Sequence, residues 1–517
     1  MGVRAAALLV LVGCNSASPT SPEVTPGADP ANTEPSVSVT FDSVPPEPTE
    51  PPAPPGDLAV HIHDDAGNAV PARLTFIPVG KTPRPAFTHG KNGDVGLAQP
   101  GAYLAFDRAF TIGDAALSVP GGEYDVWISH GPEWDVAKER IEVDPDSPMQ
   151  LSATLHHVVE MPGWISGDFH VHAEKSFDSK VPMAARLHQF VADGVGLIVA
   201  TDHDTVADYA PVAAELGVSD RIITVRGDEI TAHDWGHFGT FPMEGYTQSE
   251  ATQLAGDVPQ QMFAEVRAKQ PGGVIDIHHP RLEQGRIGYF HLGKLDTKTM
   301  TGRTGFSMDF DAVEVLNGYQ DPDRKSVDAV MADWFAFLRR GKHVTATGNS
   351  DSHHMTFNLG GYPRNYCRVD DPHDPLSLAA AVKAGHCFFT TGPLVEVTAV
   401  VPGKTVGIGD MVTTNKQPLE LHVVVKAPAW MRVDRVAILV DGIPLRQQPT
   451  RGKAPIRMDE TFKIPISRDT FVVVRVDGDH AMAPVIGDGA AFRVFPLAIT
   501  NPIWVDVDGD GKVTPSI

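Results

Sequence analysis

Six stretches of the chain run from a β-branched, strand-like segment directly into a tip of metal-ligand residues. They are DFHVH at 168–172, LIVATDHD at 197–204, IITVRGDEIT at 222–231, GVIDIHHP at 273–280, DAVEVLNG at 311–318 and HVTATGNSDSH at 343–353. Tips on successive strands converge only if the strands are parallel and form a barrel or an open sheet, where ligands gather at one end. The sequence therefore predicts a multinuclear metal site and a metallohydrolase.

Helical patterns alternate with these strands between residues 161 and 395. The clearest is 323–342, where Val, Met, Trp, Phe and Leu recur at helical spacing; 182–194 and 257–273 are two more, and Pro182 suits a first helical position. Alternating strands and helices imply parallel strands joined by crossover helices. We expect an α/β fold, a barrel or a doubly wound sheet, with the chemistry at the strand C-termini.

The candidate ligands begin with His170 and His172, which lie two apart on a strand and project to the same face. The later tips add Asp178, Asp202, His203, Glu229, His237, His278, His279, Asp351, His353 and His354. Sets that mix imidazoles and carboxylates suit Zn²⁺, Mn²⁺ or Fe²⁺, and a carboxylate can bridge two ions. Divalent metal cofactors are therefore expected.

The motifs resemble those of a known family, the PHP (polymerase and histidinol phosphatase) superfamily, and within it the carbaryl-hydrolase-like CehA/McbA branch. The matching segments are GDFHVH, ATDHD, GDEIT followed by GHFGTF, IHHPR and GNSDSH, together with SFDSKVP, EVLNG and GHCFFTTGPLVEV. The resemblance covers roughly residues 57–517. It implies a distorted (β/α)7 barrel.

The resemblance also implies a ligand set. His170, His172, Glu229 and Asp351 would hold one ion, and Glu229 would bridge to a second ion held by His237 and His279. A third position would use Asp178, His203 and His353. Asp178 stands where many members of the family have His. The sequence therefore does not decide whether the third position binds an ion, and the site would hold two or three ions.

Neighbouring residues receive other roles. Asp202 and His278 are expected to orient ligands rather than to bind metal. His233 is an alternative to His237, although GHF fits the family pattern better. Arg281, His354 and Lys175 are candidates for binding an anionic substrate.

A metal-bridging hydroxide would serve as the nucleophile, with the ions polarising the scissile bond. No GxSxG elbow, P-loop or dinucleotide-binding fingerprint is found in the sequence. We expect a hydrolase of a small-molecule ester, either a phosphoester or a carboxyl or carbamate ester. The alternative is a noncatalytic surface lipoprotein that binds metal or another ligand. The net charge of −23 disfavours nucleic acid as a partner.

The N-terminus reads as an export signal. Arg4 precedes an apolar run, and Leu11-Val12-Gly13-Cys14 resembles a bacterial lipobox, which implies acylation of Cys14. A plain signal peptide is the alternative, and N-myristoylation would need Ser or Thr where Ala6 stands. Residues 1–14 are thus a predicted lipoprotein signal and 15–56 a disordered Pro/Ser/Thr-rich tether. We expect an exported protein that contacts a bacterial membrane only through its lipid anchor.

Residues 57–160 and 396–517 alternate apolar and polar side chains and predict β-sandwich-like domains on either side of the 161–395 hydrolase domain. The first contains His61 and His63, which we interpret as ordinary strand histidines. The tail carries Asp506, Asp508 and Asp510, typical of the start of a calcium loop, but a structural turn fits better because position twelve is Ile517.

With Cys14 lipidated, Cys367 and Cys387 remain as an even pair. A disulfide between them is permitted in an oxidising compartment, and two buried free thiols are the alternative.

Overall fold

The computed structural model describes residues 53–88, 95–282, 287–318, 325–355, 359–401, 403–487 and 493–514. Cys14, the predicted signal and the predicted tether up to residue 52 lie outside the described residues. The description below concerns the compact unit formed by residues 40–517.

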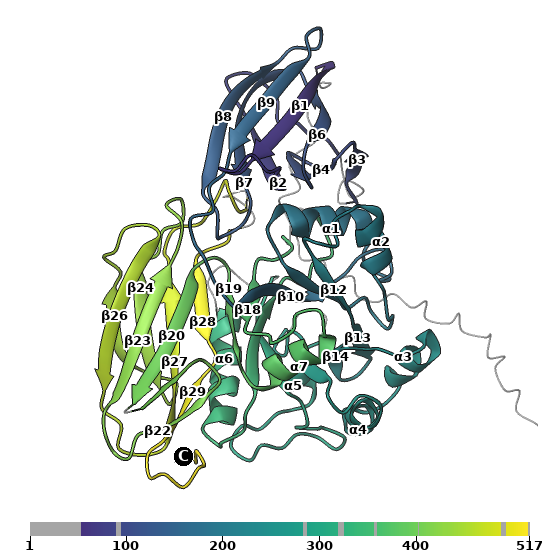
Figure 1. Cartoon of the computed structure of the whole chain (residues 1–517). Helices are drawn as coiled ribbons and strands as arrows, with labels where there is room; N and C mark the ends of the chain where they lie inside the picture. Colours follow the sequence, from purple (N-terminus) through teal and green to yellow (C-terminus); the bar gives the residue numbers. More distant parts are fainter. Residues whose placement is uncertain are drawn as a thin grey trace, which may run out of the picture. The chain divides into compact units, whose positions relative to one another are not determined.

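The N-terminal region is built from two sheets (Figure 1). The first has the order β6-β1-β9, formed by Ala115–Pro120, Pro55–His63 and Met149–Thr154. The second has the order β3-β4-β5-β2-β7-β8, formed by Leu97–Gln99, Ala102–Ala105, Arg108–Thr111, Ala72–Pro78, Gly122–Ser129 and Val136–Val143. Alternate residues of β1, such as Leu58, Val60 and Ile62, are buried in a common core with both sheets. His61 and His63 are partly exposed on the other face of β1, beside Asp114.

The predicted ligand strands fall into two groups. Strands β10 (Ile165–Val171), β11 (Leu197–Ala200) and β12 (Ile223–Arg226) are parallel neighbours. A second sheet has the order β13 (Asp228–Ala232), β14 (Gly236–Phe241), β15 (Val274–Ile277), β16 (Ala312–Asn317) and β17 (Thr345–Asn349). In it β15, β16 and β17 are parallel, while β13 and β14 form an antiparallel hairpin. The structure confirms the mixed α/β class.

Two isolated bridges join these groups at their ligand-bearing ends. Val171 pairs with Ser352 beyond β17, and His203 beyond β11 pairs with Glu229 of β13. Among the described strands, the two groups meet only through these bridges, so one continuous ladder around a barrel is not shown. Strand β18 (Arg364–Cys367) pairs antiparallel with residues 165–167 of β10. The polar tips nevertheless converge.

The described helices pack between and around these strands. They are α1 (Met183–Ala192), α2 (Ala210–Glu215), α3 (Gln248–Leu254), α4 (Pro259–Lys269), α5 (Tyr289–Leu292), α6 (Lys325–Leu338) and α7 (Pro375–Lys383). The three predicted helices are present as α1, α4 and α6. Pro182 is the residue before the first turn of α1 rather than within it, with an extended ψ of 143°. A capping box between Thr247 and Glu250 begins α3.

The C-terminal β region continues a sheet of the central region. From β18 the sheet passes through β19 (Cys387–Thr390), β28 (Leu497–Thr500), β27 (Thr470–Asp477), β24 (Arg435–Val440) and β25 (Ile443–Pro449), with β29 (Ile503–Asp506) and β22 (Met411–Thr413) beside it. A separate sheet has the order β21 (Lys404–Val406), β20 (Leu394–Val401), β23 (Leu419–Lys426) and β26 (Ile456–Ile464). The boundary drawn at residue 395 therefore divides strands that share one sheet.

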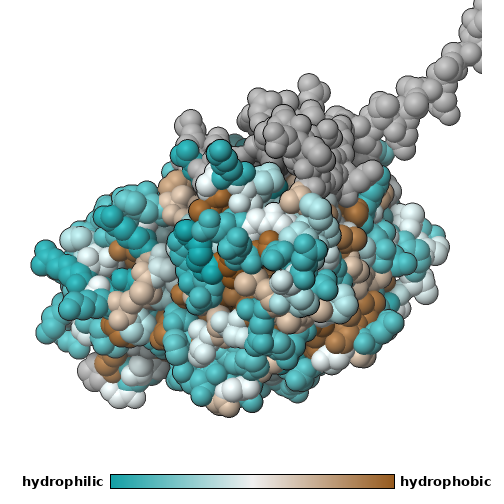
Figure 2. All heavy atoms as spheres, turned by 90° about the horizontal axis from the view of Figure 1, so that it is seen from above, coloured by the Kyte–Doolittle hydropathy of each residue, from teal (hydrophilic) through white to brown (hydrophobic). Residues whose placement is uncertain are grey.

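Hydrophilic and hydrophobic residues are interspersed on the face drawn in Figure 2. Among the described residues, none of the helices has the length and apolar character needed to cross a bilayer. In the tail, Asp506 is buried and accepts hydrogen bonds from the N–H groups of Gly509 and Gly511, as a structural turn requires. Asp508 and Asp510 lie beside Asp469 in a mostly exposed acidic group.

Candidate metal centre

His170 and His172 lie at the end of β10 and face two carboxylates. Nε2 of His170 is 3.1 Å from Oε1 of Glu229 and 3.2 Å from Oδ1 of Asp351. Nε2 of His172 is 3.2 Å from Oε2 of Glu229 and 3.3 Å from Oδ1 of Asp351. Residues from β10, β13 and the end of β17 thus meet at one point, as the spacing of the motifs predicts.

Four histidines have their Nδ1 atoms held by neighbours. Nδ1 of His170 is 3.0 Å from Oε1 of Glu314, and Nδ1 of His172 is 3.0 Å from Oγ of Ser176. Nδ1 of His203 is 2.7 Å from Oγ1 of Thr231, and Nδ1 of His353 is 3.0 Å from the carbonyl oxygen of Asp351. These contacts leave the Nε2 atoms directed at the carboxylates, which is how protein histidines are prepared to bind metal.

Within the described residues, the potential ligand atoms form four overlapping and mostly buried groups. They are His172 with Asp178, His203 and His353; His170 with Glu229 and His278; His170 with His172 and Asp351; and His203 with Glu229 and His237. The ligand atoms within each group all lie within 4.8 Å of one another. Eight of the nine predicted ligands belong to these groups, and the ninth, His279, places Nε2 3.3 Å from Oε1 of Glu229.

The site fits divalent metal ions because it buries atoms that need a partner. In the described part of the chain, Nε2 of His170, Nε2 of His172 and Oε2 of Glu229 are buried and form no hydrogen bond. The two Nε2 atoms lie 3.1 to 3.3 Å from the carboxylate oxygens of Glu229 and Asp351, an arrangement that suits a shared cation. Leaving such groups unsatisfied costs about 1 to 3 kcal/mol each, so a ligand that satisfies several of them is strongly favoured.

The electrostatics of the cluster favour ionised carboxylates. Burial alone would raise the pKa of Glu229, but the surrounding His170, His203 and His237 hold it well below its usual range. Asp351 behaves in the same way, because burial is outweighed by His170 and His353. Burial lowers the pKa of His172 and of His237 to about 4, so both rings are neutral near pH 7, whereas the neighbouring carboxylates outweigh burial and raise the pKa of His170 and of His203. Ionised carboxylates and neutral imidazoles are the forms that bind metal.

Two of the predicted ligands have an unusual backbone. Asp351 has a φ of 52° and His279 a φ of 28°, values that favour glycine. Such positions store strain and concentrate at functional sites. The strain at Asp351 and His279 is consistent with side chains held in place for a ligand.

His278 is expected to orient ligands, and it contacts the proposed ligand Glu229 directly. Its Nδ1 atom is 2.9 Å from Oε1 of Glu229, closer than Nε2 of His279, and its ring stacks on His170 with centroids 3.5 Å apart. A Cβ on Gly239 would lie 2.1 Å from Nε2 of His278, so only glycine leaves room for this ring. His278 can therefore compete with His279 for the ion beside Glu229.

Asp178 and Phe177 lie at the open side of the cluster. The Asp178 side chain is 38% exposed, and Oδ2 lies 3.2 Å from Nε2 of His203 and 3.0 Å from Nε2 of His353. Phe177 is 57% exposed and stacks on the His203 ring with centroids 4.7 Å apart. The group formed by His172, Asp178, His203 and His353 is thus the most accessible of the four.

The remaining candidates do not all face the cluster. Asp202 accepts hydrogen bonds from the N–H groups of Ala173 and Ser176, so it fixes the loop after β10, as expected of a residue that orients ligands. His233 and Lys175 are exposed, and His354 is partly buried. Asp333 engages the guanidinium of Arg281 at 2.6 and 2.9 Å, so two of its N–H donors already have a partner.

Sequence reasoning missed two side chains that hold the ligands. Glu314 contacts His170 and also accepts a hydrogen bond of 2.7 Å from the N–H of His279. Arg186 of α1 is buried and donates to the carbonyl oxygens of His172 and Ser352. The EVLNG motif marks Glu314, whereas an arginine inside an amphipathic helix gives no comparable signal.

No model of a known protein family matches the chain, and no curated protein matches it. Solved structures that resemble it include the lesion-specific endonuclease EndoQ from Pyrococcus furiosus, at 17% identity and a TM-score of 0.29, over 43% of this chain and 56% of that chain. PsfC from Pseudomonas syringae matches at 16% identity and 0.30, over 42% and 88%. A putative metal-dependent phosphoesterase from Bifidobacterium adolescentis matches at 16% and 0.27, over 42% and 95%.

The chain spans little more than half the length of the EndoQ chain. Another EndoQ structure contains a DNA duplex, which is a property of that protein.

Proposed function

We propose that the protein is a metal-dependent hydrolase that cleaves a phosphoester or a carboxyl or carbamate ester of a small molecule. The observation that carries the proposal is the convergence of buried ligand atoms from His170, His172, Glu229 and Asp351. Buried polar atoms of a purely structural cluster would be hydrogen-bonded, whereas Nε2 of His170 and Nε2 of His172 form no hydrogen bond.

The proposed ligands are His170, His172, Glu229 and Asp351 for one ion and Glu229, His237 and His279 for a second. Asp178, His203 and His353 provide a third, more exposed position. When bound, the ions would activate a water molecule and polarise the scissile bond. Zn²⁺, Mn²⁺ and Fe²⁺ all suit this set of imidazoles and carboxylates.

The chain's own residues have separable tasks. Glu314, Ser176 and Thr231 orient imidazole rings through their Nδ1 atoms. Asp202 fixes the loop that carries Asp178, and the exposed face of Phe177 borders the entrance. Among the charged candidates for substrate binding, exposed Lys175 is favoured over Arg281, which Asp333 already engages.

The type of fold and the cellular location of the protein are also proposals. We propose a distorted (β/α)7 barrel of the PHP type with flanking β domains, and export followed by lipid attachment at Cys14 of a bacterial protein. Small-molecule substrates are favoured over nucleic acid because the net charge is −23.

The test is turnover by the metal-loaded protein. Mn²⁺- or Zn²⁺-loaded wild type is assayed on a generic phosphomonoester, a phosphodiester and an aryl ester, beside His170→Ala and the matched surface control His422→Ala, whose ring contacts Asp459. We expect hydrolysis of at least one class by wild type and His422→Ala, and a loss of more than about 100-fold in His170→Ala. Equal rates in all three proteins would refute the proposal, and metal binding without turnover would favour a noncatalytic metal-binding lipoprotein.

A further inference from the structure

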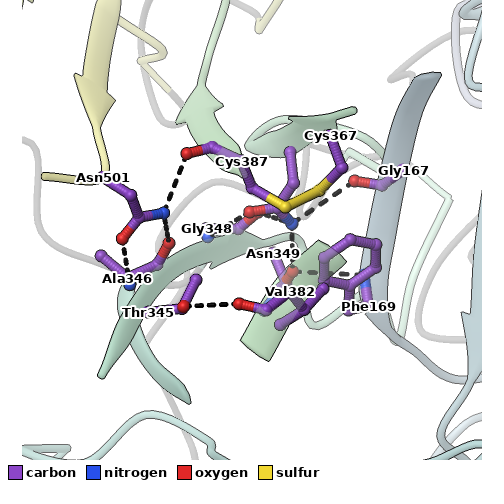
Figure 3. Close-up of a disulfide and its surroundings, with 11 residues drawn as sticks. Gly167, Phe169, Thr345, Ala346, Gly348, Asn349, Cys367, Val382, Cys387 and Asn501 are labelled. Atoms are coloured by element: carbon purple, nitrogen blue, oxygen red, sulfur yellow. Dashed lines mark hydrogen bonds between the residues drawn. A yellow bond between two sulfur atoms is a disulfide. The ribbon is translucent and has the colours of Figure 1, made fainter. Parts of the chain in front are cut away.

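One edge of β17 is paired with side chains instead of a strand. Its other edge pairs with β16 in a regular parallel ladder. On the open edge, the N–H and C=O groups of both Ala346 and Gly348 are satisfied by the side-chain amides of Asn501 and Asn365 (Figure 3). Because alternate residues of a strand direct their polar groups to the same edge, two amides placed two residues apart reproduce the pairing that a neighbouring strand would provide.

Asn365 belongs to β18 and lies between two ligand strands. Its Oδ1 accepts from the N–H of Gly348 at 3.0 Å, and its Nδ2 donates to the carbonyl oxygen of Gly348 at 3.0 Å. The same Nδ2 donates to Oδ1 of Asn349 at 2.7 Å and lies 3.4 Å from the carbonyl oxygen of Gly167 on β10. Asn365 is completely buried, so these bonds have no competition from water.

Asn501 makes the equivalent contacts from the C-terminal region, between β28 and β29. Its Oδ1 accepts from the N–H of Ala346 at 2.7 Å. Its Nδ2 donates to the carbonyl oxygen of Ala346 at 3.0 Å and to that of Cys387 at 2.9 Å. Asn501 is also completely buried. The C-terminal region thus contributes directly to the support of β17.

Both amides are tied to the disulfide. Cys367 and Cys387 are directly opposite each other on β18 and β19 and are bonded. Asn365 is on the same strand as Cys367, and Asn501 contacts the carbonyl oxygen of Cys387. The disulfide therefore joins β18, which carries Asn365, to β19, whose Cys387 carbonyl oxygen accepts from Asn501.

β17 is connected to the metal centre in two ways, through the residues that follow it and through the side chain of Asn349. β17 ends at Asn349, two residues before Asp351 and four before His353. The Nδ2 of Asn349 also donates to Oε1 of Glu314 at 3.1 Å, the same oxygen that contacts His170. A displacement of β17 would move Asp351 and would loosen the contact that orients His170.

We infer that Asn365 and Asn501 are positioning residues for the metal centre, which replace a missing strand beside β17 and so fix Asp351 and the Glu314–His170 contact. The inference rests on the proposed metal function, although it does not depend on catalysis. Its prediction concerns metal affinity and ligand geometry. Such support typically contributes about 10- to 100-fold in metal affinity.

The experiment compares Asn365→Asp and Asn501→Asp with the exposed control Asn415→Asp. Replacing NH₂ by oxygen preserves shape but sets the new oxygen against carbonyl oxygens, so the hydrogen bond to the carbonyl oxygen of Gly348 or Ala346 is lost. Zn²⁺ affinity is measured by calorimetry, and the visible absorption of Co²⁺-loaded protein reports ligand geometry. Measurements are made at a temperature where circular dichroism shows each variant to be folded.

We expect Zn²⁺ affinity to fall about tenfold or more in both buried variants, with an altered Co²⁺ spectrum, and to stay unchanged in Asn415→Asp. Variants that melt at a lower temperature but bind Zn²⁺ and Co²⁺ like wild type would overturn the inference. Wild type that binds no metal would instead overturn the proposed function, so the two failures are distinguishable.

If the buried variants do not fold, hydrogen exchange in the wild-type protein tests the inference instead. Coupling between binding and strand support is reciprocal, so Zn²⁺ must slow amide hydrogen exchange in residues 344–349 more than in β23 of the C-terminal sheet. Equal protection of these two segments would refute the inference.

Discussion

Oε1 of Glu314 lies 3.0 Å from Nδ1 of His170, while Nε2 of the same ring faces Glu229 and Asp351. One carboxylate thus selects which nitrogen of His170 is offered to a cation. Its second oxygen accepts from the N–H of His279 at 2.7 Å, so Glu314 fixes parts of two proposed ligand tips.

Glu314→Gln should therefore weaken Zn²⁺ binding by about 10- to 100-fold. The Gln side chain is neutral, and an NH₂ group replaces one of the two carboxylate oxygens of Glu314. This NH₂ group cannot accept a hydrogen bond from an N–H donor. Calorimetry on Glu314→Gln measures the effect, with the exposed Glu460→Gln as matched control. Identical affinities in the two variants would show that Glu314 does not orient a ligand.

The buried ion pair between Arg73 and Asp193 ties the N-terminal β region to the end of α1. Its atoms are 3.0 Å apart, both side chains are fully buried, and Arg73 also donates to the carbonyl oxygen of Val485. Arg73→Met should lower the free energy of unfolding by about 3 to 5 kcal/mol, because it leaves a buried carboxylate without its partner.

The control for Arg73→Met is Arg140→Met, which removes an exposed pair with Asp125 and should cost less than about 1 kcal/mol. Denaturant unfolding of the two variants gives both values. Similar costs for the two changes would contradict a supporting role for the buried pair.

The Cys367–Cys387 disulfide should contribute about 3 kcal/mol to stability, since it closes a loop with a sequence separation of 20. Denaturant unfolding with and without reductant, and of the double variant Cys367→Ser/Cys387→Ser, measures the contribution. The bridge requires that neither thiol of the unreduced, denatured protein reacts with a labelling reagent. Labelling of both would disprove it.

His130 should make the protein sensitive to acid. Burial lowers its pKa from 6.5 to about 4, and its Nδ1 lies 3.0 Å from the carbonyl oxygen of Ala192. Between pH 6.5 and pH 4 the unfolded chain binds the proton more readily than the folded one. Stability contributed by the neutral ring is complete above pH 6.5 and falls by about 3 kcal/mol at most as the pH drops to 4.

The comparison for His130 is the slope of unfolding free energy against pH in wild type and in His130→Gln, whose amide can still donate to Ala192. The variant should lose part of the slope between pH 6.5 and pH 4. Superimposable profiles would contradict the lowered pKa.

The polar strand tips were predictable because residues such as His170, Glu229 and Asp351 stand next to β-branched segments, and parallel strands bring such tips together. Helices such as α6 were predictable from the spacing of apolar residues. The antiparallel insertion of β18 was not predictable, since a short strand such as RNYC carries no mark of its partner. The role of Asn501 was equally hidden, because a side-chain amide that replaces a strand leaves no periodic signal.

The direction in which the His278 side chain points was also not predictable from the local sequence. Alternation along a strand predicts that His278 and His279 face opposite ways, but that rule fails after β15 has ended and His279 adopts a positive φ. The Arg281–Asp333 pair also depends on a tertiary contact 52 residues away in sequence. Local patterns identify which residues are candidates, and the path of the chain decides which atoms they present.

We propose that this cluster binds divalent metal ions through Glu229 and its neighbours. The most direct test is the metal content of protein loaded with Zn²⁺ or Mn²⁺ and then dialysed, measured by elemental analysis for wild type, Glu229→Ala and the surface control Glu460→Ala. We predict about two or three ions per chain in wild type and in the control, and a loss of at least one ion in Glu229→Ala. Less than one ion in wild type, or equal content in all three proteins, would contradict the account.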